Sequence, residues 1–188
     1  LVIKGVVDAV DGELARIRER PSHVGRYWDT IADTLGLILV MAAFGQYLNW
    51  DILYISGIII AVLFQYSLFN HFSVRAREIG SGDNTSRTNE FTCPLAKPWE
   101  KQIHVNFLHK IYLIGFSWQD RIIDLITGDG SEKLHFELTV SSMLGYGFQS
   151  LIILILGLST RIDLLDDLIL YANSLIMVVV VLRSRISP

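Results

Sequence analysis

Residues 52–72 read ILYISGIIIAVLFQYSLFNHF and contain no Asp, Glu, Lys or Arg over 21 positions. Residues 138–158, LTVSSMLGYGFQSLIILILGL, form a second run of the same length without these residue types. An α-helix rises about 1.5 Å per residue, so about 20 apolar residues cross the hydrocarbon core of a bilayer. Each run is therefore long enough to span a membrane as a helix.

Two shorter apolar runs, residues 35–48 and 168–182, lie next to carboxylates and span only if their helices continue into the polar flanks. Their alternation with the longer runs predicts an all-α fold, a polytopic membrane helical bundle with four visible spans. The composition agrees, because only 19% of the residues are charged, against about a quarter in soluble domains. A soluble chain of 188 residues would have to bury both uncharged runs.

The basic residues are distributed unevenly across this topology. Residues 1–34, 73–137 and 183–188 lie on one side of the membrane and hold 15 of the 16 Lys and Arg residues. Arg161 lies in the short loop on the other side. The positive-inside rule therefore predicts an integral, multi-pass membrane protein whose residues 1–34, long middle loop and C-terminus are cytoplasmic.

The overall charge and the cysteine content exclude other classes. A net charge of −3 gives no uniformly basic surface, so we expect no nucleic-acid partner. The single cysteine, Cys93, excludes an internal disulfide and a cysteine-rich metal site.

Residues 8–33, DAVDGELARIRERPSHVGRYWDTIAD, carry the pattern D-x2-D-G-x2-A-R-x8-G-x3-D-x3-D. Members three or four residues apart share one face of a helix, and a polar turn at residues 18–22 separates the two halves. Two helix ends thus present four carboxylates toward each other at the membrane boundary, where unpaired negative charge is costly. The eight members are Asp8, Asp11, Gly12, Ala15, Arg16, Gly25, Asp29 and Asp33.

Four facing carboxylates need cations, and an all-oxygen ligand set selects hard ions, Mg²⁺ or Mn²⁺, over zinc. Two such ions would neutralise the cluster and leave coordination positions open for phosphate oxygens. The small residues Gly12, Ala15 and Gly25 let a ligand approach the helix backbone closely. Arg16 adds a fixed positive charge with a bidentate geometry suited to phosphate. Solvated acids with packing glycines would explain any one of these residues, but not all eight at this spacing.

This pattern resembles the signature of the CDP-alcohol phosphotransferases, the CDP-alcohol phosphatidyltransferase family, at all eight positions. The resemblance implies a six-helix membrane bundle in which the motif joins the end of the second helix to the start of the third, on the cytoplasmic side. Four spans and the end of a fifth would then be visible in a single domain, residues 1–188. The chain begins at Leu1, and only LVIKGVV precedes the first carboxylate. We therefore expect it to be the C-terminal part of a longer protein.

The resemblance also implies a role for each residue of the signature. Asp8, Asp11 and Asp29 would hold two Mg²⁺ or Mn²⁺ ions, and Asp33 would contact metal and act as the general base on the acceptor hydroxyl. The other members would form the CDP site, with cytidine against Gly12, Ala15 and Gly25 and phosphate against Arg16.

The implied reaction moves a substituted phosphate from a CDP-alcohol to an acceptor hydroxyl and releases CMP, in phospholipid or related phosphodiester synthesis. No second signature selects the alcohols, and Thr34 stands where family members often have a basic residue. Membrane-lipid contacts and a homodimer are further implications, in the cell membrane if the source is prokaryotic. An inert scaffold of the same fold and a membrane transporter are the alternatives. All four acids are present and cluster at one membrane face, which favours the transferase.

Basic residues follow the 52–72 span at its cytoplasmic end. Arg75 and Arg77 are candidates to hold a phosphate of the acceptor or of a lipid headgroup, although a positive-inside anchor explains them equally well. For the neighbouring His71, we expect a hydrogen bond at the membrane interface rather than a ligand contact.

The long loop contains two further segments. Residues 79–98 are rich in Gly, Ser, Thr, Asn and Pro, which is typical of a flexible linker. In residues 99–126, apolar side chains recur every three or four positions. This spacing predicts an amphipathic helix or helix pair on the membrane surface, broken near Gly115.

Overall fold

The computed structural model describes Val10, Leu14, Ile17 and residues 22–79, 92–127 and 134–186, and no strand occurs among them. The predicted all-α fold is therefore confirmed. The helices are α2 His23–Tyr47, α3 Ile52–Ile79, α4 Gln102–Thr127, α5 His135–Ser141, α6 Tyr146–Leu158, α7 Leu165–Asp167 and α8 Asn173–Ile186. Two 3-10 turns, η1 Ser142–Leu144 and η2 Ile162–Leu164, and a π-helix, η3 Leu168–Ala172, connect them.

α2 and α3 form a hairpin whose turn is set by local residues. Asn49 adopts the left-handed conformation, with φ of 58°, and reverses the chain. The Asp51 carboxylate then accepts hydrogen bonds from the backbone N–H groups of Leu53 and Tyr54, both at 2.9 Å. This cap satisfies donors that the first turn of α3 would otherwise leave unpaired.

In the described part of the chain, three helical segments are long and apolar enough to cross a membrane: α2, α3 and the stretch Ile162–Ile186. The predicted runs 35–48 and 168–182 continue into their polar flanks, as spanning requires, because their helices begin at His23 and Ile162. Residues 138–158 are not one straight helix. His135–Leu144 and Tyr146–Leu158 meet at a bend of 41° and have the length of a span only as a pair.

Gly145 lies at this bend with an extended backbone, φ −69° and ψ 154°. A Cβ atom there would lie 3.1 Å from the ring of Phe69 and 3.0 Å from the carbonyl oxygen of Ser142. The glycine thus permits the close approach of α3 to the bend.

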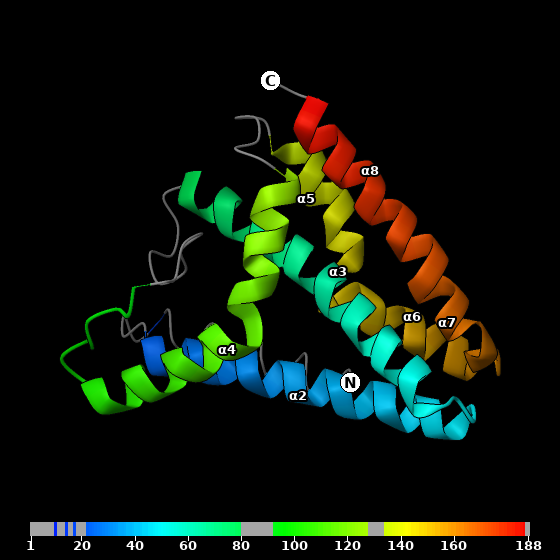
Figure 1. Cartoon of the computed structure of the whole chain (residues 1–188), viewed down its shortest axis with the longest axis horizontal. Helices are drawn as coiled ribbons and strands as arrows, with labels where there is room; N and C mark the ends of the chain where they lie inside the picture. Colours follow the sequence, from blue (N-terminus) through cyan, green and yellow to red (C-terminus); the bar gives the residue numbers. More distant parts are fainter. Residues whose placement is uncertain are drawn as a thin grey trace.

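α4 bridges the hairpin at its open end. α2 and α3 diverge from their shared turn, and α4 first follows α2 and then turns toward α5 (Figure 1). The prediction of a break near Gly115 is wrong: α4 is one continuous helix, and it bends. Side chains that bond backbone carbonyls within a helix promote such bending. Ser117 Oγ donates to the Leu113 carbonyl at 2.6 Å, and Trp118 Nε1 donates to the Gly115 carbonyl at 3.1 Å.

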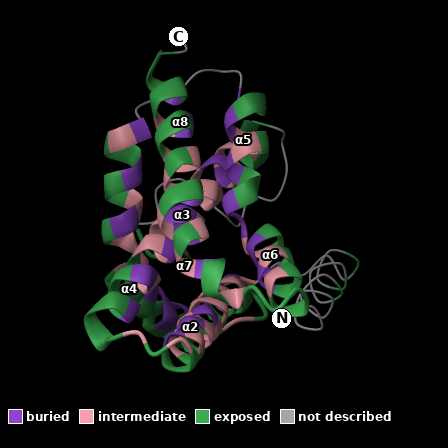
Figure 2. Ribbon diagram, turned by 90° about the vertical axis from the view of Figure 1, so that its right-hand side faces the viewer, coloured by how far each residue is buried: buried purple, intermediate pink, exposed green. Residues whose placement is uncertain are grey.

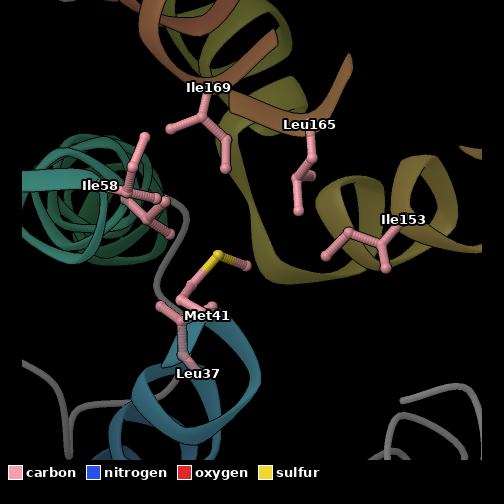
Figure 3. Close-up of a cluster of buried hydrophobic side chains, with 7 residues drawn as sticks. Leu37, Met41, Ile58, Ile153, Leu165 and Ile169 are labelled. Atoms are coloured by element: carbon pink, nitrogen blue, oxygen red, sulfur yellow. The ribbon is translucent and has the colours of Figure 1, made fainter. Parts of the chain in front are cut away.

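The core near the hairpin turn joins five elements of the chain (Figure 3). Side chains from α2, α3, α6, α7 and η3 meet there, and they are Leu37, Met41, Ile58, Val62, Ile153, Leu165 and Ile169. A second cluster joins the later part of α3 to α4, α8 and the segment around α5; its members are Leu68, Phe72, Ile123, Leu134, Leu144 and Val180. Close packing of this kind holds helices together in lipid as well as in water.

Large apolar side chains also remain on the outside of the bundle, where Figure 2 shows exposed residues along every long helix. On α4 these include Ile103, Phe107, Ile114 and Leu125, which are between 64% and 81% exposed. Apolar surface of this extent on long helices suits contact with lipid.

Candidate active site

The second half of the signature lies on the first half of α2. Gly25, Asp29 and Asp33 follow one another at intervals of one turn, so they share a face of the helix, as predicted. Gly25 and Asp29 are exposed and Asp33 is half-buried. Tyr27 lies on the opposite side and is only 1% exposed. α2 therefore has an accessible carboxylate face and a packed face.

α4 covers the packed face. The Tyr27 ring lies 5.7 Å from the ring of His109 and 5.3 Å from that of Tyr112, measured between centroids. Val105 and Leu108 complete this buried cluster. Because this packing holds the Tyr27 side of α2 against α4, the opposite face of α2 stays accessible.

The start of α2 is held by a residue far along the chain. Ser22 is the N-cap, and its Oγ accepts a hydrogen bond from Gly25 N at 2.9 Å. The same hydroxyl donates to Glu100 Oε1 at 2.8 Å, and Val24 N donates to that oxygen at 2.7 Å. Lys97 N donates to Glu100 Oε2 at 3.0 Å. One carboxylate thus accepts bonds from the first turn of α2 and from its own turn.

These contacts favour the ionised form of Glu100. Burial alone would raise the pKa of the carboxyl, but the hydrogen bonds from the backbone of Val24 and Lys97 and from Ser22 lower it below the ordinary glutamate value. His23 contributes in the same direction. α2 has no acidic residue in its own first turn, so Glu100 supplies the negative charge that a helix N-terminus favours.

Comparison with known proteins identifies the family. The CDP-alcohol phosphatidyltransferase family model matches residues 1–95, just over half of the chain, and this range contains the whole signature. The chain belongs to the CDP-alcohol phosphatidyltransferase family. No curated protein and no solved structure matches it. Family membership confirms the predicted resemblance and indicates a transferase, in agreement with the three apolar helices of a membrane protein.

The accessible face of α2 fits the divalent ions of a CDP-alcohol phosphatidyltransferase. Asp29 and Asp33 offer oxygen ligands of the kind that Mg²⁺ and Mn²⁺ prefer. Among the described residues, a Cβ at Gly25 would meet only the Ser22 side chain, at an ordinary contact distance of 3.4 Å. Glycine inside a helix costs about 1 kcal/mol relative to alanine. The described neighbours leave room for a Cβ at this position, so their packing does not explain the glycine. A ligand that lies against the helix would explain it.

The first half of the family signature lies outside the described residues. Within the described ranges, no group of three or more His, Cys, Asp or Glu side chains is placed to hold a metal ion. The predicted residues outside these ranges are Asp8, Asp11, Gly12, Ala15 and Arg16.

Arg75 and Arg77 lie near the end of α3, which is apart from the first half of α2 (Figure 1). Burial raises the pKa of Asp124 on α4, and the charge of Arg75 opposes that rise, so the two side chains interact. Arg77 Nε donates to the Ser73 carbonyl of its own helix at 3.2 Å. Of the signature carboxylates, only Asp29 and Asp33 lie within the described residues, and this end of α3 does not lie beside them.

His71 contacts α4, and its hydrogen bonds agree with the prediction for an interfacial histidine. Its Nδ1 lies 3.2 Å from Asp124 Oδ1, and its Nε2 lies 3.3 Å from Thr127 Oγ1. Both ring nitrogens are thus engaged in joining α3 to α4.

Sequence reasoning missed Glu100 and the role of Tyr27. Glu100 lies 76 residues from Val24, just after the predicted linker and at the start of the predicted amphipathic helix, whereas α4 begins only at Gln102. No local pattern marks it as the partner of α2. Tyr27 lies at a variable position of the signature, between Gly25 and Asp29. Its burial could be inferred only from a helical wheel of α2, on which it lies opposite these two residues.

Proposed function

We propose that this chain is a membrane transferase that moves a substituted phosphate from a CDP-alcohol to an acceptor hydroxyl and releases CMP. The observation that carries the proposal is the family match together with the accessible face of α2, on which Gly25, Asp29 and Asp33 keep the family spacing. The setting would be phospholipid or related phosphodiester synthesis, with active-site residues on the cytoplasmic side.

Two divalent ions, Mg²⁺ or Mn²⁺, would be held by Asp29 and Asp33 together with Asp8 and Asp11 of the first half of the signature. Such ions neutralise the diphosphate and stabilise the negative charge that develops on the departing CMP. Asp29 is exposed on the helix surface, which suits a ligand at the outer side of the site. Asp33, one turn further and half-buried, lies closer to the bundle.

Asp33 would act as the general base. Its carboxylate takes the proton of the acceptor hydroxyl while the acceptor oxygen forms a bond to the phosphorus that carries the alcohol. The bond from that phosphorus to the bridging oxygen breaks, and CMP leaves with the bridging oxygen. A carboxylate within hydrogen-bond reach of the hydroxyl can do this once nearby cations offset the charge of its neighbours.

The remaining members of the signature would bind the CDP moiety. Gly25 offers helix backbone without a side chain above it, so a flat base can approach closely. Gly12 and Ala15 would line the same cytidine site, and Arg16 would contact phosphate. Arg75 and Arg77 remain candidates for a phosphate on the acceptor or a lipid headgroup, reached from the α3 side.

α4 would lie at the membrane interface. It carries two faces, one packed on α2 through Val105, Leu108 and Tyr112, and the other exposed and apolar. An amphipathic helix of this kind binds the boundary between headgroups and acyl chains. Lipid contact there would hold α4, and hence α2, at the level of the membrane surface. Membrane helices left exposed also offer a surface for a homodimer.

The decisive experiment measures Mg²⁺-dependent CMP release by the full-length protein. CDP-diacylglycerol and CDP-inositol would each be offered glycerol phosphate, inositol phosphate, inositol and serine. Release with one pair would establish the transferase and identify both alcohols. Silence across the panel, from folded protein that binds divalent metal, would point to an untested alcohol or to an inert scaffold.

A further inference from the structure

We propose that Glu100 is a positioning residue whose carboxylate fixes the first turn of α2 and thereby the placement of Asp29 and Asp33. The catalytic consequence rests on the proposed transferase function, whereas the effect on α2 itself does not. Glu100 belongs to no signature position, and it is not expected to touch substrate.

The Glu100 carboxylate connects two segments that are distant in the sequence. Oε1 accepts from Ser22 Oγ at 2.8 Å and from Val24 N at 2.7 Å, while Oε2 accepts from Lys97 N at 3.0 Å. The turn around Glu100 is itself closed, because Glu100 N donates to the Lys97 carbonyl at 2.9 Å. The carboxylate is therefore held on both oxygens, and it holds α2 from a formed turn.

Glu100 adds to the start of α2 what a local cap does not supply. Ser22 Oγ accepts the hydrogen bond of Gly25 N. Val24 N needs an acceptor of its own, which the Glu100 carboxylate provides. Helix starts without such partners fray, and a negative charge stabilises them. The Glu100 charge reaches this position from another segment, so the start of α2 depends on residues 97–100.

The position of the first turn matters because the carboxylates follow it directly. Asp29 lies about one turn beyond Val24, and Asp33 lies one turn further. Tyr27 packs on α4 and orients α2 about its axis. Glu100 fixes the position of the first turn of α2 through its hydrogen bond from Val24 N. Groups that orient metal ligands affect metal affinity and turnover without contacting the metal. A shift of about 1 Å in a reacting group can cost about 100-fold in rate.

The test uses full-length protein in detergent and compares Glu100→Ala, Glu100→Gln, Ser22→Ala and the double variant Ser22→Ala/Glu100→Ala. Three quantities are measured: Mn²⁺ affinity by paramagnetic resonance, hydrogen exchange of the amides of residues 24–33, and CMP release. The matched control is Asp163→Asn, which also removes one carboxylate. Asp163 is exposed, lies 3.5 Å from Arg161, and is far from α2 in the sequence.

Glu100→Ala should weaken Mn²⁺ binding about tenfold, the lower end of the range for residues that orient metal ligands. Exchange at residues 24–33 should quicken, and kcat should fall more than KM rises, while the protein stays folded at the temperature of the assay. Glu100→Gln should recover part of the affinity, because its amide oxygen can still accept from Ser22 and Val24. The loss of Mn²⁺ binding free energy in the double variant should be smaller than the sum of the losses in the two single variants, because both substitutions remove the same contact. Asp163→Asn should match the wild type.

Unchanged exchange and Mn²⁺ affinity in Glu100→Ala would overturn the proposal. A loss of affinity that only follows a loss of folded protein would also overturn it, and so would a Glu100→Gln variant as impaired as Glu100→Ala. If wild-type protein releases no CMP from any donor, the proposed function fails instead. The exchange measurement then still decides the role of Glu100.

Discussion

Gln65 of α3 donates a hydrogen bond from Nε2 to the backbone carbonyl of Ile169 at 2.8 Å, across 104 residues of sequence. Its Oε1 accepts from Asn173 Nδ2 at 2.9 Å. Gln65 is fully buried and Asn173 is 2% exposed. Ile169 belongs to the π-helix Leu168–Ala172, whose altered hydrogen bonding suits a side-chain partner. Two apolar segments long enough to span a membrane are thus joined by a paired polar contact.

Gln65→Leu should therefore destabilise the bundle. The substitution leaves the Ile169 carbonyl and the Asn173 amide without this partner, and each buried group left unpaired costs about 1–3 kcal/mol. Chemical unfolding in detergent would measure the loss of unfolding free energy. Ser56→Ala is the control on the same helix, because Ser56 is exposed and its hydroxyl bonds the Ile52 carbonyl of its own turn. Equal stability of Gln65→Leu and the control would show that the buried contact contributes nothing.

The helical part of this architecture could be predicted because hydrophobic length and i, i+4 spacing are local properties. The run at 52–72 became α3, and Asp29 and Asp33 share the face that their spacing predicts. The bend at Gly145 could not be predicted in the same way, because it depends on how closely α3 approaches that residue.

The contact that holds the start of α2 could not be predicted from the sequence either. Glu100 accepts a hydrogen bond from Val24 because the turn at residues 97–100 lies against the start of α2, and nothing in the local sequence specifies that contact. The continuity of α4 was mispredicted for a related reason. A glycine in a helical pattern predicts a break, but α4 continues through Gly115. It bends there, where Ser117 and Trp118 donate to the Leu113 and Gly115 carbonyls.

Asp33→Asn should abolish CMP release while CDP-alcohol binding survives. The amide keeps the size of the side chain but cannot take the proton of the acceptor hydroxyl. Binding would be measured by calorimetry and turnover by CMP release, both in the full-length protein. Thr34→Ser, the adjacent conservative change, serves as the control for local helix structure; the Thr34 hydroxyl bonds the Thr30 carbonyl at 2.8 Å, which serine can reproduce. Near-normal turnover by Asp33→Asn would exclude Asp33 as the base.

Removal of divalent metal should stop the reaction. The proposed ligands are carboxylates, which would repel a diphosphate unless divalent cations lay between them. Exhaustive chelation should reduce CMP release to background, and Mg²⁺ or Mn²⁺ should restore it, whereas Ca²⁺, with its longer and more variable coordination distances, should restore less. Full activity in the chelated protein would reject a two-metal mechanism.

Glu100 should also make the start of α2 sensitive to acid. Burial alone would raise the pKa of this carboxyl, but its hydrogen bonds lower it below the ordinary glutamate value, so the folded state binds the proton less readily than the unfolded state. The stabilisation is therefore complete above the ordinary value of about 4.3 and is lost as the pH falls through the lower folded pKa. Unfolding free energy, measured in a non-ionic detergent between about pH 3 and 6, should fall more steeply with acid in the wild type than in Glu100→Gln. The two curves should converge at low pH, because protonation removes from the wild type the charge that the variant already lacks. Parallel curves over the whole range would mean that the Glu100 carboxylate is not stabilised by the start of α2.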